Sequence, residues 1–90
     1  MNAPAHNFDL QTAVESEMML IGGLLRDTRR IDAVADIVKP ADFAEPFFGA
    51  IYSVILDQHA RGDAVTILTL RPHISQHPGF EIMGGNAFLA

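Results

Sequence analysis

Cysteine and tryptophan are both absent from this sequence of 90 residues. Without thiols the residues given cannot form a disulfide, supply a thiol nucleophile or bind zinc through thiolates. Lysine occurs only as Lys39, which precedes a proline and has no glycines near it. A P-loop needs phosphate-cradling glycines followed by lysine and a hydroxyl. Nucleotide hydrolysis through a P-loop within this sequence is therefore excluded.

Basic residues are scarce: six Lys and Arg stand against eleven Asp and Glu, which gives a net charge of −5. Such a chain is repelled by phosphates, so we expect no direct DNA binding. No apolar run reaches the roughly 18 residues of a membrane span, and the N-terminus lacks the basic and apolar regions of a signal peptide. We therefore expect a cytoplasmic protein with no membrane contact.

What the sequence does contain is apolar residues, 49% of the total against 19% charged, as is typical of one small folded domain. Their spacing is helical throughout, and no alternating pattern of a strand occurs. The start and stop signals predict a first helix from a capping box at Thr12–Glu15, a second from Asp27–Thr28, a third between Pro46 and Gly62, and a fourth capped by Thr66. The predicted class is all-α.

Four further expectations concern local structure. Residues 1–10 are expected to form a flexible N-terminal arm, because they are small or polar and show no periodicity. The pair Gly22–Gly23 favours a close approach of another backbone over a mere weak spot. Pro72 predicts a break in the fourth helix between Leu70 and His73, because proline removes an amide donor and crowds the preceding turn. The core is predicted to contain Ile21, Leu25, Val34, Ile37, Ile51, Tyr52 and Ile55.

No catalytic constellation or metal site is visible in the sequence. His73 and His77 are four residues apart, but no third ligand accompanies them, and a zinc site needs three or four. Glu15 and Glu17 fall on different sides of a helix and are interpreted as solvated first-turn carboxylates. We expect no catalytic residues, no metal and no cofactor in these residues.

Candidate interface residues are apolar and basic side chains that the helical pattern does not assign to the core. Only one of two adjacent methionines can face the core, and a local basic cluster can touch an acidic partner, although a purely structural role is favoured for it. The candidates for a protein interface are Met18, Met19, Arg26, Arg29, Arg30, Phe80, Met83, Phe88 and Leu89.

Several short segments occur together in one order. They are Glu15-Ser16-Glu17, Leu20-Ile21-Gly22-Gly23-Leu24-Leu25, Asp36-Ile37-Val38-Lys39-Pro40-Ala41-Asp42-Phe43, Pro46, Ile51-Tyr52, Arg61-Gly62-Asp63-Ala64-Val65 and Gly84-Gly85-Asn86-Ala87-Phe88-Leu89. Together they resemble the N-terminal domain of the DnaB-type bacterial replicative DNA helicase. The resemblance covers residues 11–90 and departs from the family pattern at Pro72.

The resemblance implies a compact orthogonal multi-helix bundle that acts in DNA replication without catalysis. In this family the N-terminal domains form a collar on a hexameric motor and help to recruit primase and helicase loaders. ATP and Mg²⁺ belong to a separate C-terminal domain, and a helical hairpin follows the bundle. We expect residues 11–90 to lack that hairpin and to form a monomer or weak dimer. The alternative is an autonomous helical interaction module, a phage or plasmid relative, and the discriminator is whether the reading frame continues past Ala90.

Overall fold

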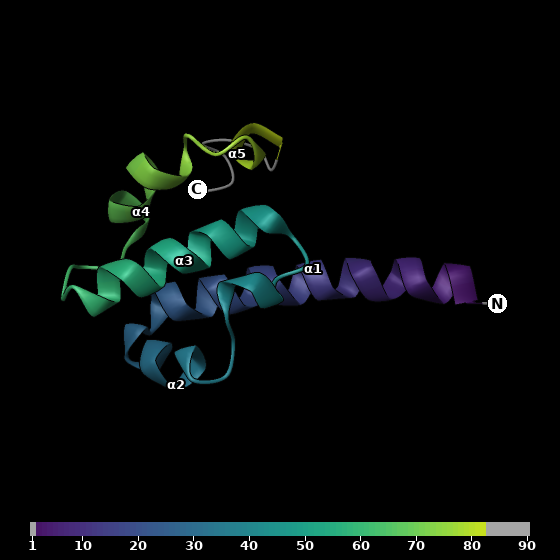
Figure 1. The fold of residues 1–90 in the computed structure, drawn as a ribbon, viewed down its shortest axis with the longest axis horizontal. Helices are drawn as coiled ribbons and strands as arrows, with labels where there is room; N and C mark the ends of the chain where they lie inside the picture. Colours follow the sequence, from purple (N-terminus) through teal and green to yellow (C-terminus); the bar gives the residue numbers. More distant parts are fainter. Residues whose placement is uncertain (1, 83–90) are drawn as a thin grey trace.

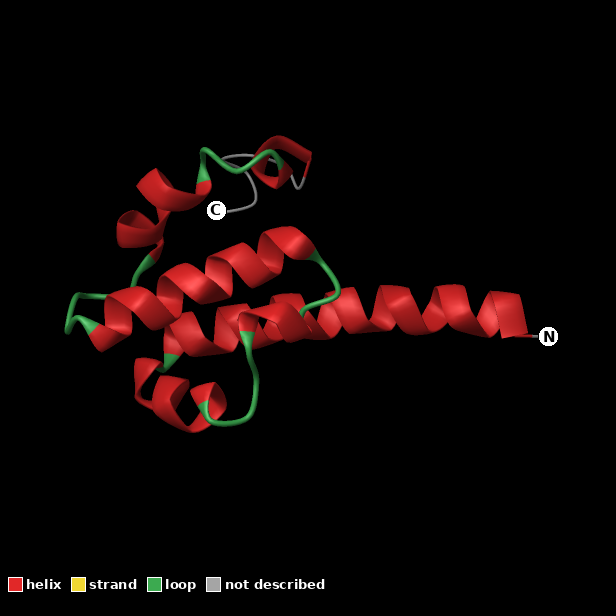
Figure 2. Ribbon diagram, viewed as in Figure 1, coloured by secondary structure: helices red, strands yellow, loops and turns green. Residues whose placement is uncertain are grey.

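The computed structural model describes residues 2–82, and the side chains of residues 11–81. Over this range the elements are α1 (Asn2–Arg26), η1 (Thr28–Arg30), α2 (Ile31–Ala35), η2 (Pro40–Asp42), α3 (Pro46–Ala60), α4 (Ile67–Ile74) and α5 (Gly79–Ile82), where η denotes a short 3-10 helix. Every element of the described range is helical, as Figure 2 shows. The all-α prediction is confirmed.

The helix α3 is the centre of the fold and packs against α1, α2, η2, α4 and α5. It lies beside the C-terminal half of α1, and both helices run in the same sense (Figure 1). In that view α2 lies below this pair, whereas α4 and α5 lie above it. The N-terminal half of α1 extends beyond the globule, and the longest extent of the molecule is 48 Å.

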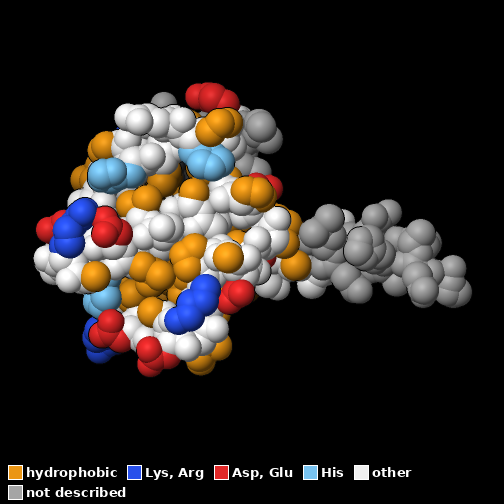
Figure 3. Space-filling view, viewed as in Figure 1, with side chains coloured by type: hydrophobic (Ala, Val, Ile, Leu, Met, Phe, Trp, Pro, Cys, Tyr) orange, Lys and Arg blue, Asp and Glu red, His pale blue; other side chains and the backbone are white. Residues whose placement is uncertain are grey.

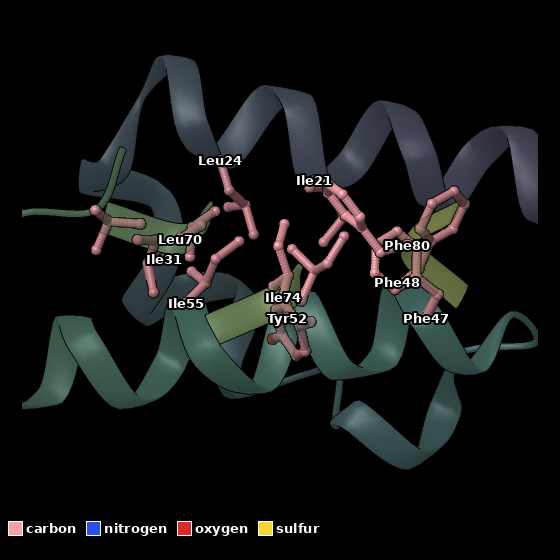
Figure 4. Close-up of a cluster of buried hydrophobic side chains, with 12 residues drawn as sticks. Ile21, Leu24, Ile31, Phe47, Phe48, Tyr52, Ile55, Leu70, Ile74 and Phe80 are labelled. Atoms are coloured by element: carbon pink, nitrogen blue, oxygen red, sulfur yellow. The ribbon is translucent and has the colours of Figure 1, made fainter. Parts of the chain in front are cut away.

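The core fills the space between α1 and α3 and the short helices that cover them (Figure 4). Its members are Ile21, Leu24, Ile31, Phe47, Phe48, Ile51, Tyr52, Ile55, Val65, Leu70, Ile74 and Phe80. Four of the predicted core residues are among them, and Leu25 and Val34 pack against the cluster while partly exposed.

The prediction that Ile37 is buried is wrong, because 79% of its surface is exposed. The helix α2 ends at Ala35, and the amide of Ile37 donates to the carbonyl of Val34 in a turn, 2.9 Å away. A spacing of three residues places two side chains on one face only while the helix continues. The chain leaves the helix before Ile37, so the apolar face ends at Val34.

The expected arm over residues 1–10 is also corrected, because α1 begins at Asn2 and not at Thr12. Extending an existing helix adds one hydrogen bond for each residue that is fixed, whereas a new start is costly. Pro4 falls within the first turn, where no intrahelical amide donor is required. Nothing in this stretch therefore prevents the helix from continuing backwards.

The predicted boundaries of α3 and the predicted start of α4 are confirmed by their caps. Pro46 occupies the first turn of α3, and Gly62 follows its end with a left-handed φ of 77°. At the start of α4, the Thr66 hydroxyl accepts from the amide of Thr69 at 3.2 Å, and the Thr69 hydroxyl accepts from the amide of Thr66 at 2.9 Å. These signals are local, since each residue stabilises its own turn.

The predicted break at Pro72 does not occur, because α4 runs through this residue from Ile67 to Ile74. Pro72 lies too far into the helix to be a first-turn residue, so it leaves the Leu68 carbonyl without its usual donor. Both residues are exposed and lie one turn apart on the face away from the core, where water can take that position. The helix therefore continues without the bond.

Close approaches of other residues occur at glycines outside the predicted pair, from backbone at Gly49 and from a side chain at Gly79. A Cβ on Gly49 would lie 2.8 Å from the Pro40 carbonyl oxygen, and one on Gly79 would lie 2.7 Å from the Cβ of Phe47. A Cβ on Gly23 would meet no atom within 4 Å, and one on Gly22 would meet only the Arg26 guanidinium. The expectation of a close partner for this pair is not met within the described part of the chain.

Candidate protein-interaction surface

Five large apolar side chains are exposed on the described surface: Met18, Met19, Ile37, Ile67 and Leu68. The most exposed belong to α1, the turn after α2, and α4, so that they lie on three separate elements. Figure 3 shows hydrophobic side chains gathered over and beside α3 on one face, with charged side chains toward its edges. A contiguous exposed apolar area, and not a single exposed apolar residue, is where partner contacts are expected on a small domain.

The methionine pair is more exposed than predicted, because neither residue is buried. Met18 is 43% exposed and Met19 is 74% exposed. The core face of α1 is formed by Ile21 and Leu24, on the opposite side of the helix from Met19. Both methionines therefore stay accessible to a partner.

The predicted basic cluster is partly neutralised within the chain. The Asp27 carboxylate pairs with Arg29 at 2.9 Å and with Arg30 at 3.3 Å, and it also accepts from the amide of Arg29 to cap η1. The hydrogen bond from Arg29 lowers the pKa of Asp27, and the same contact raises the pKa of Arg29. Among the described side chains, Arg26 has no ion-pair partner and is the cluster's unpaired cation.

Phe80 is corrected as an interface candidate, because it is only 4% exposed. Its ring meets that of Phe47 edge-on, with the centroids 6.4 Å apart, which places Phe80 in the core. Met83, Phe88 and Leu89 lie outside the described residues.

Glu17 has a structural role that the sequence interpretation missed. Its carboxylate accepts hydrogen bonds from the amides of Ala44 at 2.6 Å and Glu45 at 3.1 Å, at the start of α3. Glu45 in turn caps α3 by accepting from the amide of Phe47. A carboxylate suits the positive end of a helix, so Glu17 fastens α1 to α3. The partners are 27 and 28 positions away, and no local pattern could have indicated them.

The histidines form contacts within the domain. The Nδ1 atom of His77 accepts from the amide of Gly79 at 2.9 Å, and its ring lies 5.4 Å from that of Phe47. His59 and Asp32 join α3 to α2 through a contact of 3.0 Å between Nε2 and a carboxylate oxygen. Over the described side chains, no three His, Asp or Glu residues come close enough to hold a metal ion.

A buried polar contact positions the exposed face of α4. Gln58, only 3% exposed, donates from its amide nitrogen to the Thr69 carbonyl at 2.8 Å, and its amide oxygen accepts from the Thr69 hydroxyl at 3.0 Å. A buried amide must be satisfied in this way, so the contact fixes the position of α4 along α3. Leu68, 75% exposed, is thereby held on the outer side of the fold.

Comparison with known families gives this fold its context. The profile of the DnaB-like helicase N terminal domain matches residues 9–90. The chain belongs to this family. The match covers all of the core and all the exposed apolar residues described above.

The curated relatives of this DnaB-like domain are much longer proteins. The Replicative DNA helicase DnaB proteins of Rickettsia conorii and Rickettsia felis are each 30% identical over 81 residues, and that of Rickettsia prowazekii is 27% identical. The alignments cover 90% of this chain but only 16% to 17% of each relative. No solved structure matches the chain. Among the described residues, no helix has the length and apolar character to cross a membrane.

Proposed function

We propose that this DnaB-like domain is the non-catalytic part of a replicative DNA helicase that joins subunits together and docks primase or a helicase loader. The observation that carries the proposal is the family match over residues 9–90. Hydrolysis of ATP with Mg²⁺ and movement along DNA are assigned to parts of the helicase outside these residues. The net charge of −5 supports a role in protein contacts and not in direct DNA binding.

The surface supports a docking role in two places. Ile37 is exposed in the turn after α2, and Leu68 is exposed on α4. Figure 1 places α2 and α4 on opposite sides of α3, so the turn after α2 and the helix α4 lie on separate parts of the fold. A domain with two such surfaces can contact two partner proteins together.

Binding to purified partners tests the proposal. The fluorescently labelled domain is titrated with primase and with helicase loader from the same organism, and anisotropy is recorded. We expect binding in the micromolar range, weakened by Leu68→Asp or Ile37→Asp but not by Ser53→Asp, an exposed polar position on α3. Absence of binding to either protein at about 100 μM would contradict the docking role.

A further inference from the structure

The outward face of α1 carries an unusual arrangement of side chains. Glu15, Met19, Gly22 and Arg26 follow one another at spacings of four, three and four residues, so they form one stripe along the helix, with Gly23 beside it. The stripe lies opposite the buried residues of α1 and faces away from the core. Glu15 and Arg26 are exposed, and Met19 is 74% exposed.

This stripe, which we call the α1 stripe, is symmetric about its midpoint between Leu20 and Ile21. Glu15 and Arg26 lie equally far from that midpoint, on opposite sides of it, and so do Met19 and Gly22. Across a two-fold axis each residue contacts the residue placed symmetrically to itself. Two antiparallel copies of α1 would therefore bring each Glu15 to the other copy's Arg26.

The same arrangement would place each Met19 over the other copy's Gly22. A Cβ on Gly23 would meet nothing within 4 Å, and one on Gly22 would meet only the guanidinium nitrogens of the flexible Arg26 side chain, 3.8 Å away. Glycine lets a second backbone come near, and methionine adapts its shape to the surface that it contacts. A large exposed side chain would thus face a position that has no side chain of its own.

The charges favour this antiparallel arrangement over a parallel one. Within the described side chains, neither Glu15 nor Arg26 has an ion-pair partner, whereas Arg29, Arg30 and Arg61 all do. In a parallel pair, Glu15 would face Glu15 and Arg26 would face Arg26. Like charges opposite each other suppress that pairing, and opposite charges fix the orientation.

From this self-complementarity we infer that the α1 stripe is a contact between two copies of this chain, formed about a two-fold axis. The inference rests on the proposed function, since the second copy is another helicase subunit, and it names the residues through which two subunits meet. One helix pair buries less than the roughly 1,200 Å² typical of stable interfaces, so free domains should associate weakly. Tethering in an assembly would raise the effective concentration and populate the contact.

Charge reversals test the inference through sedimentation equilibrium. Glu15→Arg and Arg26→Glu should each weaken self-association by about tenfold or more, because each creates two like-charge contacts. The double variant should restore the wild-type dissociation constant to within about threefold, because each pair is re-formed with its charges exchanged. An equimolar mixture of the two single variants should also associate, since every contact between different variants is then favourable.

Two controls change the net charge equally elsewhere. Glu81→Arg on α5 and Arg71→Glu on α4 alter exposed residues outside the α1 stripe and should leave self-association within about threefold of wild type. A wild-type chain that stays monomeric at about 1 mM would overturn the inference. So would single reversals without effect, or a mixture that associates no better than its components. If primase or loader binding persists in any of these cases, the proposed function stands and only the α1 contact is rejected.

Discussion

The Tyr52 hydroxyl donates a hydrogen bond to the carbonyl oxygen of Val38, 2.8 Å away, and so joins α3 to the segment that follows α2. The Tyr52 side chain is fully buried, and its ring lies 5.0 Å from that of Phe43. A buried hydroxyl of this kind must keep its partner. The hydroxyl oxygen of Tyr52 on α3 therefore fixes the position of the chain segment between α2 and α3.

The first prediction concerns alkaline pH. Burial, and secondarily the nearby Asp42 carboxylate, raises the pKa of Tyr52 above its ordinary value of 10.0. The folded state thus holds this proton more tightly than the unfolded state, so the stabilisation is complete below about pH 10 and is lost as pH rises through the folded-state pKa. Urea unfolding should show stability falling in that window. Since Tyr52 is the only tyrosine, phenolate absorbance reports its titration directly.

Tyr52→Phe is the control for this pH effect. It should be less stable by about 1–3 kcal/mol near neutral pH, because the Val38 carbonyl loses its donor. Its stability should then change little between neutral and alkaline pH. A variant that loses as much alkaline stability as the wild type would assign the effect to another group.

The second prediction compares two neighbouring glutamates of α1. Glu17→Ala removes both hydrogen bonds to the amides of Ala44 and Glu45, so it should cost about 1–3 kcal/mol of unfolding free energy. Glu15→Ala, at an exposed position, should stay within about 0.5 kcal/mol of wild type. Chemical denaturation of both variants at low protein concentration makes the comparison. Equal effects would show that Glu17 does not hold α1 to α3.

The third prediction separates two helical glycines. Gly49→Ala should destabilise the fold by about 1–3 kcal/mol, because its Cβ would lie 2.8 Å from the Pro40 carbonyl oxygen and force backbone to move. Gly23→Ala meets no such obstacle and should stabilise α1 by up to about 1 kcal/mol through helix propensity. Thermal melts of dilute samples would rank the wild type, Gly49→Ala and Gly23→Ala by stability. The reverse order would mean that η2 does not approach α3 as described.

The fourth prediction tests burial at two isoleucines that the sequence pattern treats alike. Ile51→Ala should cost about 2–5 kcal/mol, since Ile51 is 1% exposed and its truncation leaves a cavity. Ile37→Ala should cost under about 0.5 kcal/mol, since Ile37 is 79% exposed. Guanidinium unfolding curves provide both values. A large loss for Ile37→Ala would place this residue in the core.

How far the sequence alone could predict the fold depended on the range of each interaction. Pro46, Gly62 and Thr66 marked their helix ends correctly, because each acts on its own turn. The close approaches at Gly49 and Gly79 and the contact of Glu17 depend on elements distant in the chain, and so they were missed. Phe80 was predicted to be an interface residue because the helical pattern left it over as an apolar side chain. Its burial against Phe47 arises only once α5 packs on α3, which the sequence pattern could not indicate.

The same difference between local and long-range interactions applies to the candidate interaction surface. The helical periodicity predicted that one methionine of the pair is exposed. The exposure of Met18 as well depends on the rotation of α1 about its own axis relative to α3. The pairing of Arg29 with Asp27 is a local contact that spacing alone could have indicated. That Arg26 has no ion-pair partner among the described side chains becomes clear only when the structure shows which carboxylates lie within ion-pairing distance.

The contact between Gln58 and Thr69 also determines how α4 can separate from α3 in a local unfolding event. A helix of eight residues such as α4 is not stable by itself in water, so it persists only while it is held against α3. Releasing it would expose a buried amide together with Leu70 and Ile74. Partial opening at this site is therefore expensive, and amide protons of α3 and α4 should exchange with solvent together, as one cooperative unit.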